Sequence, residues 1–558
     1  MPTATLTAEE IEQLSPTFLG PTWQKDSLGA WLLPKRTLGW QIAGWCTEYL
    51  QAEDGGPWKF TREQLRFVLH WYAVDDDGRF TNRKGVLQRM KGWGKDPLLA
   101  VLCLVELVGP SRFDRWAAPG DVKKGLASEV GEPIGKAHPR AWVQVTAVNQ
   151  SQTTNTMALI PSLMSDAFKA KYGVKDGAVL IRANGGKARL EAVTSSYRSL
   201  EGKRTTFTLL NETHHWVSGN NGHKMYETID GNATKQDSRY LAITNAFLPG
   251  EDSVAERMRE SFEKIREGRA VDVGFMYDSI EAHPETPLTP EALHIVIPKI
   301  RGDAVWLIPG TIIQSILDTT ISASRSRRMW LNQVVAEEDA IYGPAEWDPL
   351  IDEGKTLKPG DEIVLGFDGG KSSDSTALVA IRVRDMHVSL LAIWEHLEGE
   401  AGKDWTVPRH EVDSQVHEAF RLFEVQAMFA DVALWESYIS DWAETYGERL
   451  AVKSPVGKDA IGWDMRGSQK SVTLAHERLM RTIFDKKLSH DGDLTLRRHV
   501  LSARRRTNNY GISFGKESKD SPRKIDAYAA LMLAHEALYE LRVRGKKVRK
   551  RSGRGYFL

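Results

Sequence analysis

The chain has 558 residues, of which 41% are hydrophobic and 27% charged, a composition typical of a soluble globular protein. A length prior of about 150 residues per domain predicts two to four domains. The 74 basic and 74 acidic residues cancel, so nucleic-acid binding would have to come from local patches. The two cysteines lie far apart, which excludes a disulfide or zinc-finger scaffold and fits a reducing compartment. We expect neither a signal peptide nor a membrane span, because the most apolar run, Leu98 to Val105, is far shorter than the roughly 20 residues a span needs.

Residues 1–55 are rich in tryptophan and proline without a regular period, and we interpret them as an N-terminal adapter. A helical apolar pattern begins after Phe60, and Thr61 is its N-cap candidate. Gln64 lies just inside this helix. A polar residue there is ordinarily solvated, so a functional role for Gln64 requires a nucleotide-binding motif further along the chain.

The segment Val86 to Leu99 contains Gly92-Trp93-Gly94-Lys95, which has the ending of a P-loop. In such loops, backbone N–H groups and a lysine hold phosphates at a helix N-terminus. The leading glycine of the motif is replaced by Arg89 and its hydroxyl residue by Asp96. A bare Gly-x-Gly-Lys is more often a surface turn, so this interpretation requires further strands.

Three apolar segments supply those strands: Ala141 to Val148, Phe207 to Leu210 and Tyr240 to Ile243. The second runs into Asn211-Glu212, where P-loop ATPases keep the residues that bind magnesium and activate water. The third ends in Thr244-Asn245, polar residues placed to sense a γ-phosphate. In this order, with helices between, the segments predict a parallel nucleotide-binding sheet.

Asp96 and Asn211 depart from the usual site in opposite ways, and the two departures have one explanation if they are linked. In the usual site the carboxylate near magnesium is at the position that Asn211 occupies here. In this chain the carboxylate is instead at the loop position, Asp96. We hypothesise that Asp96 supplies the negatively charged ligand of the metal, while Glu212 polarises the attacking water. The competing interpretation is a degenerate site that binds nucleotide weakly or not at all.

A second chemical signal is Ile363 to Asp374, where a continuous apolar run ends in Asp368 and a glycine-rich loop leads to Asp374. This pattern is typical of a buried strand that delivers a carboxylate to a metal site. The alternative is a hairpin in which Asp368 and Gly369 only make the turn.

Two further acidic residues support the metal interpretation. The short apolar strand 427–430 ends in Asp431, and Asp526 opens the helix AYAALMLAHEAL. Strands at Thr376 to Val383 and Val388 to Trp394 and a helix at about 411–423 lie between them. Convergence of the carboxylates on a pair of magnesium or manganese ions would permit phosphodiester cleavage by water.

These motifs resemble those of the large terminase subunit of tailed phages, over roughly residues 55–540. RMKGWGKD is similar to its Walker A segment, TLLNETHHW to its Walker B segment, ITNA to its coupling motif and FTREQ to its adenine-contacting glutamine motif. GFDGGKSSDSTAL, MFADVALWE, HVLSARRRTNNYG and KIDAYAALMLA are similar to the four nuclease blocks in order and spacing.

The resemblance implies an α/β protein with a P-loop ATPase domain, a parallel sheet flanked by helices, followed by an RNase H-like nuclease domain with a mixed sheet. It implies Asp368, Asp431 and Asp526 as nuclease metal ligands, with Asp374 as a further candidate. For the ATP site the candidates are Gln64, Arg89, Gly92, Gly94, Lys95, Asp96, Asn211 and Glu212. Thr244 and Asn245 are the coupling candidates, and Arg89 and Arg198 are the candidates for an arginine that acts on a neighbour's ATP.

The predicted organisation is an N-terminal adapter (1–55), a P-loop ATPase core (56–270), a helical lid or linker (271–355), an RNase H-like nuclease (356–542) and a basic tail (543–558). The expected activity is ATP-driven translocation of double-stranded DNA into a prohead, with metal-dependent cleavage of concatemers. ATP, Mg²⁺ for the ATPase and Mg²⁺ or Mn²⁺ for the nuclease are the implied cofactors. The implied partners are DNA, a portal protein, a small terminase subunit and further copies in a ring, in the host cytoplasm and transiently at the portal vertex.

Two other functions fit the same residues. One is an RNase H-like nuclease of the resolvase or transposase type with an inactive nucleotide site. The other is a packaging adapter in which neither site turns over.

Overall fold

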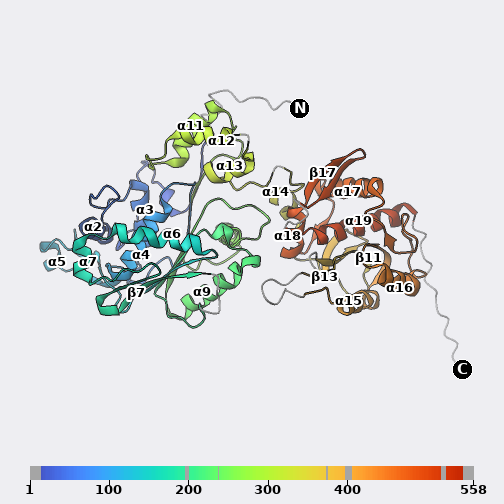
Figure 1. Ribbon diagram of the computed structural model, residues 1–558, viewed down its shortest axis with the longest axis horizontal. Coiled ribbons are helices and arrows are strands. Elements are labelled where there is room, and N and C mark those ends of the chain that lie inside the picture. The colour runs from blue at the N-terminus through green and yellow to red at the C-terminus, as the bar shows by residue number, and fades with distance from the viewer. Residues whose placement is uncertain are drawn as a thin grey trace. The chain divides into compact units, whose positions relative to one another are not determined.

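The computed structural model describes residues 14–194, 200–236, 238–318, 320–337, 339–371, 375–395, 405–516 and 523–544. The chain divides into two units (Figure 1). The first unit comprises the residues up to 248 together with 252–335, and the second comprises 249–251 and the residues from 336 onwards. None of the helices in these described ranges combines the length and apolar character needed to cross a membrane.

The elements of the first unit are, in chain order, β1 (Thr17–Leu19), η1 (Pro21–Trp23), α2 (Gly39–Tyr49), α3 (Arg62–Trp71), β2 (Lys84–Gln88), α4 (Lys95–Val108), β3 (Arg112–Trp116), α5 (Pro119–Lys123), β4 (Pro133–Lys136), β5 (Trp142–Ala147), α6 (Gln150–Leu163), α7 (Asp166–Tyr172), β6 (Leu180–Ala183), η2 (Asn184–Gly186), β7 (Ala188–Thr194), β8 (Phe207–Leu210), η3 (Thr213–His215), η4 (Ser218–Asn220), α9 (Gly222–Gln236), β9 (Arg239–Thr244), α10 (Val254–Arg266), β10 (Phe275–Glu281), α11 (Pro290–Arg301), α12 (Pro309–Leu317) and α13 (Ala323–Trp330).

The first unit is built on an 8-stranded sheet in the order β1-β10-β2-β9-β8-β5-β7-β6. The strands from β10 to β7 in this order pair in parallel, and β1 and β6 add antiparallel edges. Strand β9 lies between β2, which leads into the phosphate loop, and β8, which leads into Asn211 and Glu212. This inserted strand defines the additional-strand P-loop architecture, so the predicted α/β fold is confirmed for this unit.

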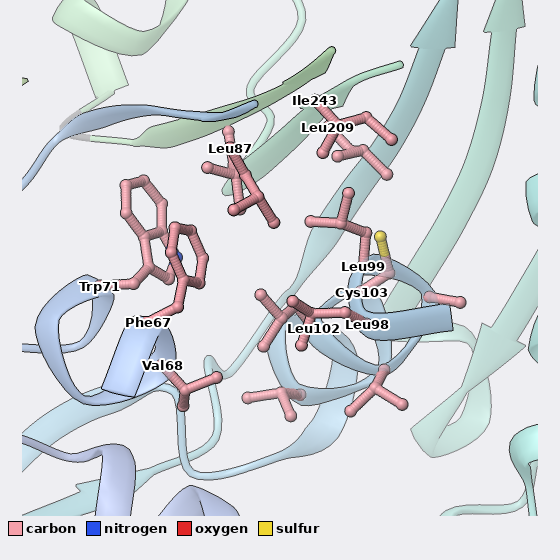
Figure 2. Packing of buried hydrophobic residues seen from close by; sticks show 14 of the residues in the cluster. Phe67, Val68, Trp71, Leu87, Leu98, Leu99, Leu102, Cys103, Leu209 and Ile243 are labelled. Carbon is pink, nitrogen blue, oxygen red and sulfur yellow. The ribbon is translucent and has the colours of Figure 1, made fainter. Parts of the chain in front are cut away.

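Both faces of this sheet are covered by helices. Successive side chains of a strand point to opposite sides, so each strand contributes to two cores. Figure 2 shows one face, where Leu87, Leu209 and Ile243 of three adjacent strands lie opposite helices α3 and α4. On the other face, Val86 and Leu210 pack in a separate core with residues of α9 and α10. Helix α4 is thereby fixed beneath the strand ends that carry the polar motif residues.

The predicted division near residue 270 is wrong for β10, which is the second strand of the sheet and does not belong to a helical lid. All seven residues of β10 are buried, including Asp278 and Glu281. Their charges are paired with Arg89 and Arg259, respectively. The acidic residues interrupt the apolar pattern by which a strand is recognised in sequence. In addition, part of the expected adapter, strand β1, pairs with β10 at the edge of the same sheet.

The elements of the second unit are α14 (Pro344–Trp347), η5 (Asp348–Leu350), β11 (Glu362–Gly369), β12 (Thr376–Arg382), β13 (His387–Trp394), α15 (Arg409–Leu422), β14 (Glu424–Asp431), α16 (Glu436–Tyr446), β15 (Gly462–Trp463), α17 (Gln469–Phe484), β16 (Ser489–His490), α18 (Leu494–Ser502), β17 (Arg504–Asn508), β18 (Gly511–Gly515) and α19 (Asp526–Arg544).

The sheet of the second unit has the strand order β15-β14-β11-β12-β13-β16. Strands β11, β12 and β13 form an antiparallel meander, and β14 pairs in parallel with β11. Three antiparallel strands extended by parallel strands beside the first is the RNase H-like arrangement, so the expected mixed sheet is confirmed. Helices α15 and α16 contribute to the core on one face, and α17 and α19 to the core on the other.

Gly366 of β11 lies directly against α19 and makes a strong test of this packing. A Cβ at this position would lie 1.9 Å from the carbonyl oxygen of Ala530 and 2.4 Å from the amide nitrogen of Ala534. Both atoms belong to the backbone of α19, so Gly366→Ala has to displace the helix. Overpacking a core ordinarily costs about 1–3 kcal/mol, and we expect at least the upper end of this range in the free energy of unfolding.

Chemical denaturation of the full chain measures this loss, with Gly354→Ala as the matched control. A Cβ at Gly354 would meet no atom closer than 3.4 Å, which is ordinary van der Waals contact. Equal losses of stability in the two variants would contradict the packing of α19 on β11.

Candidate nucleotide and nuclease sites

The phosphate loop connects β2 to α4 and has its two glycines in the left-handed region. Gly92 has φ 78° and Gly94, the N-cap of α4, has φ 93°. L residues rarely adopt this conformation, so glycine is required at both positions. Gly94 has no side chain with which to cap the N-terminus of α4. Its first N–H groups and the positive end of its dipole therefore form a ready anion site.

Lys95 is the first residue of α4, and its ammonium group is held inside the loop. Nζ donates to Asn245 Oδ1 at 2.7 Å and to the carbonyl oxygens of Met90 and Arg89 at 3.1 and 3.2 Å. Burial lowers the pKa of Lys95, and the negative charge of Glu212 opposes this shift. The structure thus brings together the predicted phosphate-binding lysine and the predicted coupling residue.

Glu212 is the second residue after β8 and has a left-handed φ of 55°. Its Oε2 is 3.5 Å from Asn245 Nδ2 and 3.2 Å from His214 Nδ1. Burial raises the pKa of Glu212, while Lys95 lowers it. A partly buried carboxylate with an elevated pKa is suited to accept a proton from water.

His214 is a member of this site that the sequence reasoning missed. The Thr244 hydroxyl donates to Asn245 O at 2.7 Å, so its oxygen accepts from His214 Nδ1 at 3.1 Å. His214 therefore links Glu212 to the coupling pair Thr244 and Asn245. Burial holds the pKa of His214 well below its ordinary value, which favours the neutral imidazole. The only sequence signal was its position two residues after Glu212.

Asp96 and Asn211 are the two residues that we expect near magnesium. Burial raises the pKa of Asp96, and Asp96 in turn raises the pKa of Glu212, so the two carboxyls lie within electrostatic reach. Asn211 Nδ2 donates to Thr156 Oγ1 at 3.0 Å and to Gln152 O at 3.3 Å on α6. Its Oδ1 is buried and has no hydrogen-bond partner among the described residues. This free oxygen and the Asp96 carboxylate are the kind of donors that Mg²⁺ accepts.

The prediction for Arg89 is wrong, because its guanidinium is buried between the Trp93 ring, 4.9 Å away, and the sheet. Its guanidinium is 1% exposed and forms an ion pair with the buried carboxylate of Asp278 on β10. It also donates to the carbonyl oxygens of Gln88 and Asp278 at 2.9 and 3.0 Å. Arg89 is therefore not available as an arginine for a neighbour's ATP, and only its carbonyl contacts Lys95. Arg198, the other candidate, lies outside the described residues.

Gln64 is buried at the start of α3, where Thr61 is the N-cap as predicted. Thr61 Oγ1 accepts from Gln64 N at 3.2 Å, and Gln64 Oε1 accepts from Thr61 N at 3.1 Å, which completes a capping box. Gln64 Nε2 lies 3.5 Å from the position that a Cβ on Gly94 would take. The predicted adenine-contacting amide therefore borders the phosphate loop.

Asp368 lies within β11 and not in a turn, which excludes the hairpin-turn interpretation. Strand β11 continues to Gly369, and Asp368 pairs with Ala377 of β12. On the other side of β11, Phe367 pairs in parallel with Ala430 of β14. Asp368 and Asp431, which come next in the two strands, are therefore neighbours across them. Asp374, the further candidate, lies outside the described residues.

Asp431 and Asp526 are both buried and each accepts a backbone hydrogen bond. Asp431 Oδ1 accepts from Met465 N at 3.2 Å, and burial raises the pKa of Asp431. Asp526, the first residue of α19, accepts from Ser375 N at 3.3 Å through Oδ2. Ser375 precedes Thr376, which pairs with Gly369 beside Asp368. The elements that carry the three predicted carboxylates therefore come together at the same end of strands β11 and β14.

Glu395 is a fourth acidic residue near this edge, and the sequence reasoning missed it. Its Oε1 lies 3.1 Å from His499 Nε2 and 3.5 Å from Ser375 Oγ, and its Oε2 accepts from Arg498 at 2.6 Å. Burial alone would raise the pKa of Glu395, but the hydrogen bond from His499 and the charge of Arg498 lower it to about 2. Glu395 follows the apolar run of β13, the same strand-end signal that indicated Asp368.

His499 connects this group to α19. Its ring is fully buried, and Nδ1 accepts from Ala527 N at 2.9 Å, so Nε2 carries the proton and donates to Glu395. Because Ala527 follows Asp526, His499 fixes the backbone beside one of the predicted metal ligands. We interpret Glu395 and His499 as positioning residues.

The donors at this edge fit divalent magnesium or manganese. Asp368, Asp431 and Asp526 offer only oxygen atoms, which hard cations prefer. Lys516 Nζ lies 4.0 Å from Asp526 Oδ1, at the limit of an ion pair. A bound cation would favour the charged form of these carboxylates.

Arginines of α13 and β17 could contact DNA phosphates, but several of them are engaged within their own units. Arg327 donates to Gln333 Oε1 at 3.0 Å, and the buried Arg328 donates to Val335 O at 3.3 Å. In the second unit Arg504 is buried and donates to Leu501 O at 3.0 Å. Arg325 is exposed. The tail from 545 onwards lies outside the described residues.

No family model matches the sequence. The chain is 40% identical to the gene 13 protein of Mycobacterium phage L5 over 585 aligned positions, which cover 95% of this chain and 95% of that protein. It is 40% identical to the gene 13 protein of Mycobacterium phage D29 over 587 positions, covering 95% of this chain and 96% of that protein. Among solved structures, the large terminase of bacteriophage HK97 is 14% identical and covers 90% of this chain and 100% of its own, with a TM-score of 0.47. The chain therefore belongs to the family of the gene 13 proteins of mycobacteriophages L5 and D29.

Proposed function

We propose that this protein is a terminase large subunit, an ATP-driven motor that moves double-stranded DNA into a phage prohead and cuts it with a metal-dependent nuclease. One observation carries the proposal. A single chain combines a phosphate loop opposed by a partly buried glutamate with an RNase H-like sheet that presents three carboxylates. The first site provides for ATP turnover and the second for cleavage, and packaging of concatemeric DNA requires both.

In the nucleotide site, the N–H groups of α4 and the Lys95 ammonium would hold the phosphates. Asp96 and Asn211 Oδ1 would hold Mg²⁺, which neutralises charge on the phosphates. Glu212 would orient the attacking water and accept its proton. Asn245 contacts both Lys95 and Glu212, so a change at either residue is passed to β9 through the coupling pair.

In the nuclease site, Asp368, Asp431 and Asp526 would hold Mg²⁺ or Mn²⁺, which activates water and stabilises charge on the phosphate. Glu395 and His499 would keep the start of α19 in register with β11. The implied partners are double-stranded DNA, a portal protein, a small terminase subunit and further copies of this chain in a ring. The implied location is the host cytoplasm, with transient docking at the portal vertex.

The proposal is tested by assaying the purified full-length protein for DNA-stimulated ATP hydrolysis and for plasmid nicking with Mg²⁺ or Mn²⁺. A terminase large subunit should show both activities. Cleavage without ATP hydrolysis would indicate a resolvase- or transposase-type nuclease with an inactive nucleotide site. Absence of both activities would indicate a packaging adapter.

The exchanged positions of Asp96 and Asn211 give a sharper test of the ATP site. We expect Asp96→Ser to lower Mg²⁺-dependent ATP hydrolysis by at least about tenfold, because it removes the negatively charged ligand of the metal. The double variant Asp96→Ser/Asn211→Asp returns the carboxylate to its usual side and should recover most of the activity. Steady-state hydrolysis as a function of Mg²⁺ concentration measures both effects. Full activity of Asp96→Ala would contradict the role of Asp96.

A further inference from the structure

A segment far along the chain lies against the phosphate loop. It connects α11 to α12 and contains Trp306 and Leu307. Trp306 Nε1 donates to Gly92 O at 2.9 Å across a sequence separation of 214 residues. A Cβ on Gly92 would lie 2.9 Å from Leu307 Cδ2, and a Cβ on Gly94 would lie 2.9 Å from Trp306 Cζ2. The indole therefore lies directly over Gly94, the N-cap of α4.

The segment is fixed relative to α3, the helix that carries Gln64. Glu63 N donates to Asp303 Oδ2 at 2.8 Å, and Asp303 N donates to Glu63 Oε1 at 3.2 Å. These reciprocal bonds connect the residue beside Gln64 to the residue three positions before Trp306. The indole and the Gln64 amide are thus held on the same small part of the loop.

Gln64 and Trp306 meet over Gly94. Gln64 Nε2 lies 3.5 Å from the position that a Cβ on Gly94 would take, and the indole borders the same position. The Oε1 atom of Gln64 is already an acceptor for Thr61 N, so the amide presents its donor nitrogen at the loop. A nucleobase joined through its ribose to phosphates at this helix N-terminus lies within reach of both side chains.

The exposure of the indole indicates that its outer face is available. Trp306 is 49% exposed, whereas Trp93 of the same loop is 1% exposed. The backbone hydrogen bond and the contact with Gly94 involve Nε1 and Cζ2, which lie along one edge of the indole, so these contacts do not cover its faces. Aromatic side chains are frequent in ligand sites, and nucleic-acid bases commonly stack on them.

We propose that the exposed face of the Trp306 indole is the platform on which the base of a bound nucleotide stacks, beside the Gln64 amide. The inference rests on the proposed function, because it assumes that the loop binds nucleotide. It extends that function by assigning the base to a residue of the α11–α12 segment. It also accounts for Gly94, where any side chain would displace the indole.

The test compares ATP with inorganic tripolyphosphate, which has the phosphates but no base. Binding of each to the full-length protein is measured by calorimetry with Mg²⁺ for the wild type, Trp306→Ala and Trp306→Phe. Trp40→Ala is the matched control, since Trp40 is 52% exposed on α2 and is not part of the loop. We expect Trp306→Ala to weaken ATP binding about tenfold and to leave tripolyphosphate binding unchanged. Trp306→Phe should keep ATP affinity within about threefold of the wild type, because phenylalanine also stacks.

Three outcomes would overturn the inference. Unchanged ATP affinity of Trp306→Ala would exclude stacking, and equal weakening of both ligands would assign Trp306 a structural role. Tighter binding of both ligands would mean that the indole covers the phosphate site as a lid. Failure of the wild type to bind either ligand would instead contradict the proposed ATPase function itself.

Discussion

Replacing Lys95 with alanine should abolish DNA-stimulated ATP hydrolysis and leave nuclease activity intact. Lys95 Nζ lies inside the phosphate loop and contacts Asn245, which in turn contacts Glu212. The variant therefore loses both the positive charge on the phosphates and the anchor of the coupling pair. Removing one such preorganised donor commonly costs a factor of about 10²–10³ in turnover, and we expect at least a hundredfold loss.

Steady-state phosphate release measures this effect, and Lys91→Ala is the matched control. Lys91 is an exposed lysine of the same loop. It should retain hydrolysis within a few fold of the wild type. If Lys95→Ala hydrolysed ATP at the wild-type rate, the loop would not be the catalytic nucleotide site.

The second large effect is expected at Asp368. Asp368→Asn keeps the shape of the side chain and removes the charge, so β11 should fold normally. Metal-ion catalysis contributes several kcal/mol of charge stabilisation, and loss of one ligand should reduce plasmid cleavage by at least about a hundredfold. DNA-stimulated ATP hydrolysis should stay at the wild-type level.

Plasmid nicking at several Mg²⁺ and Mn²⁺ concentrations measures the loss at Asp368. Asp441→Asn, which neutralises an exposed aspartate of α16, is the matched control and should cleave normally. Equal cleavage by Asp368→Asn and the wild type would contradict the assignment of Asp368 as a metal ligand.

Where a strand is buried on both faces, its apolar run was sufficient to predict it. Strand β11 is the best example, because Ile363, Leu365 and Phe367 enter one core and Val364 enters the other. The order of such strands also predicted that Glu212 and Asn245 would lie near Lys95, since parallel strands end at the same edge.

The sequence was insufficient where the partner of a polar residue is distant in the chain. Arg89 has the position of a nucleotide-site residue, but Asp278, which is 189 residues away, holds its guanidinium in the sheet. The same ion pair concealed β10, because a buried aspartate in a strand cannot be distinguished from a loop residue without its partner. Trp306 gave no signal for the same reason.

The nuclease site contains residues that the sequence predicted and one that it did not. Asp368, Asp431 and Asp526 were predicted from their places at strand ends and at a helix start. Glu395 has the same strand-end signal but was not distinguished from an ordinary terminal residue. Only its contacts with His499 and Ser375 connect it to the site. The five-part division of the chain stays a prediction, apart from the correction at β10.

The proposed function requires that one chain carry two separate catalytic sites, one for ATP and one for DNA cleavage. The most direct measurement assays DNA-stimulated ATP hydrolysis and plasmid cleavage together in the wild type, Lys95→Ala and Asp368→Asn. We expect the wild type to have both activities, Lys95→Ala to lose only hydrolysis and Asp368→Asn to lose only cleavage. Retention of cleavage by Asp368→Asn, or of ATP hydrolysis by Lys95→Ala, would contradict the two-site function.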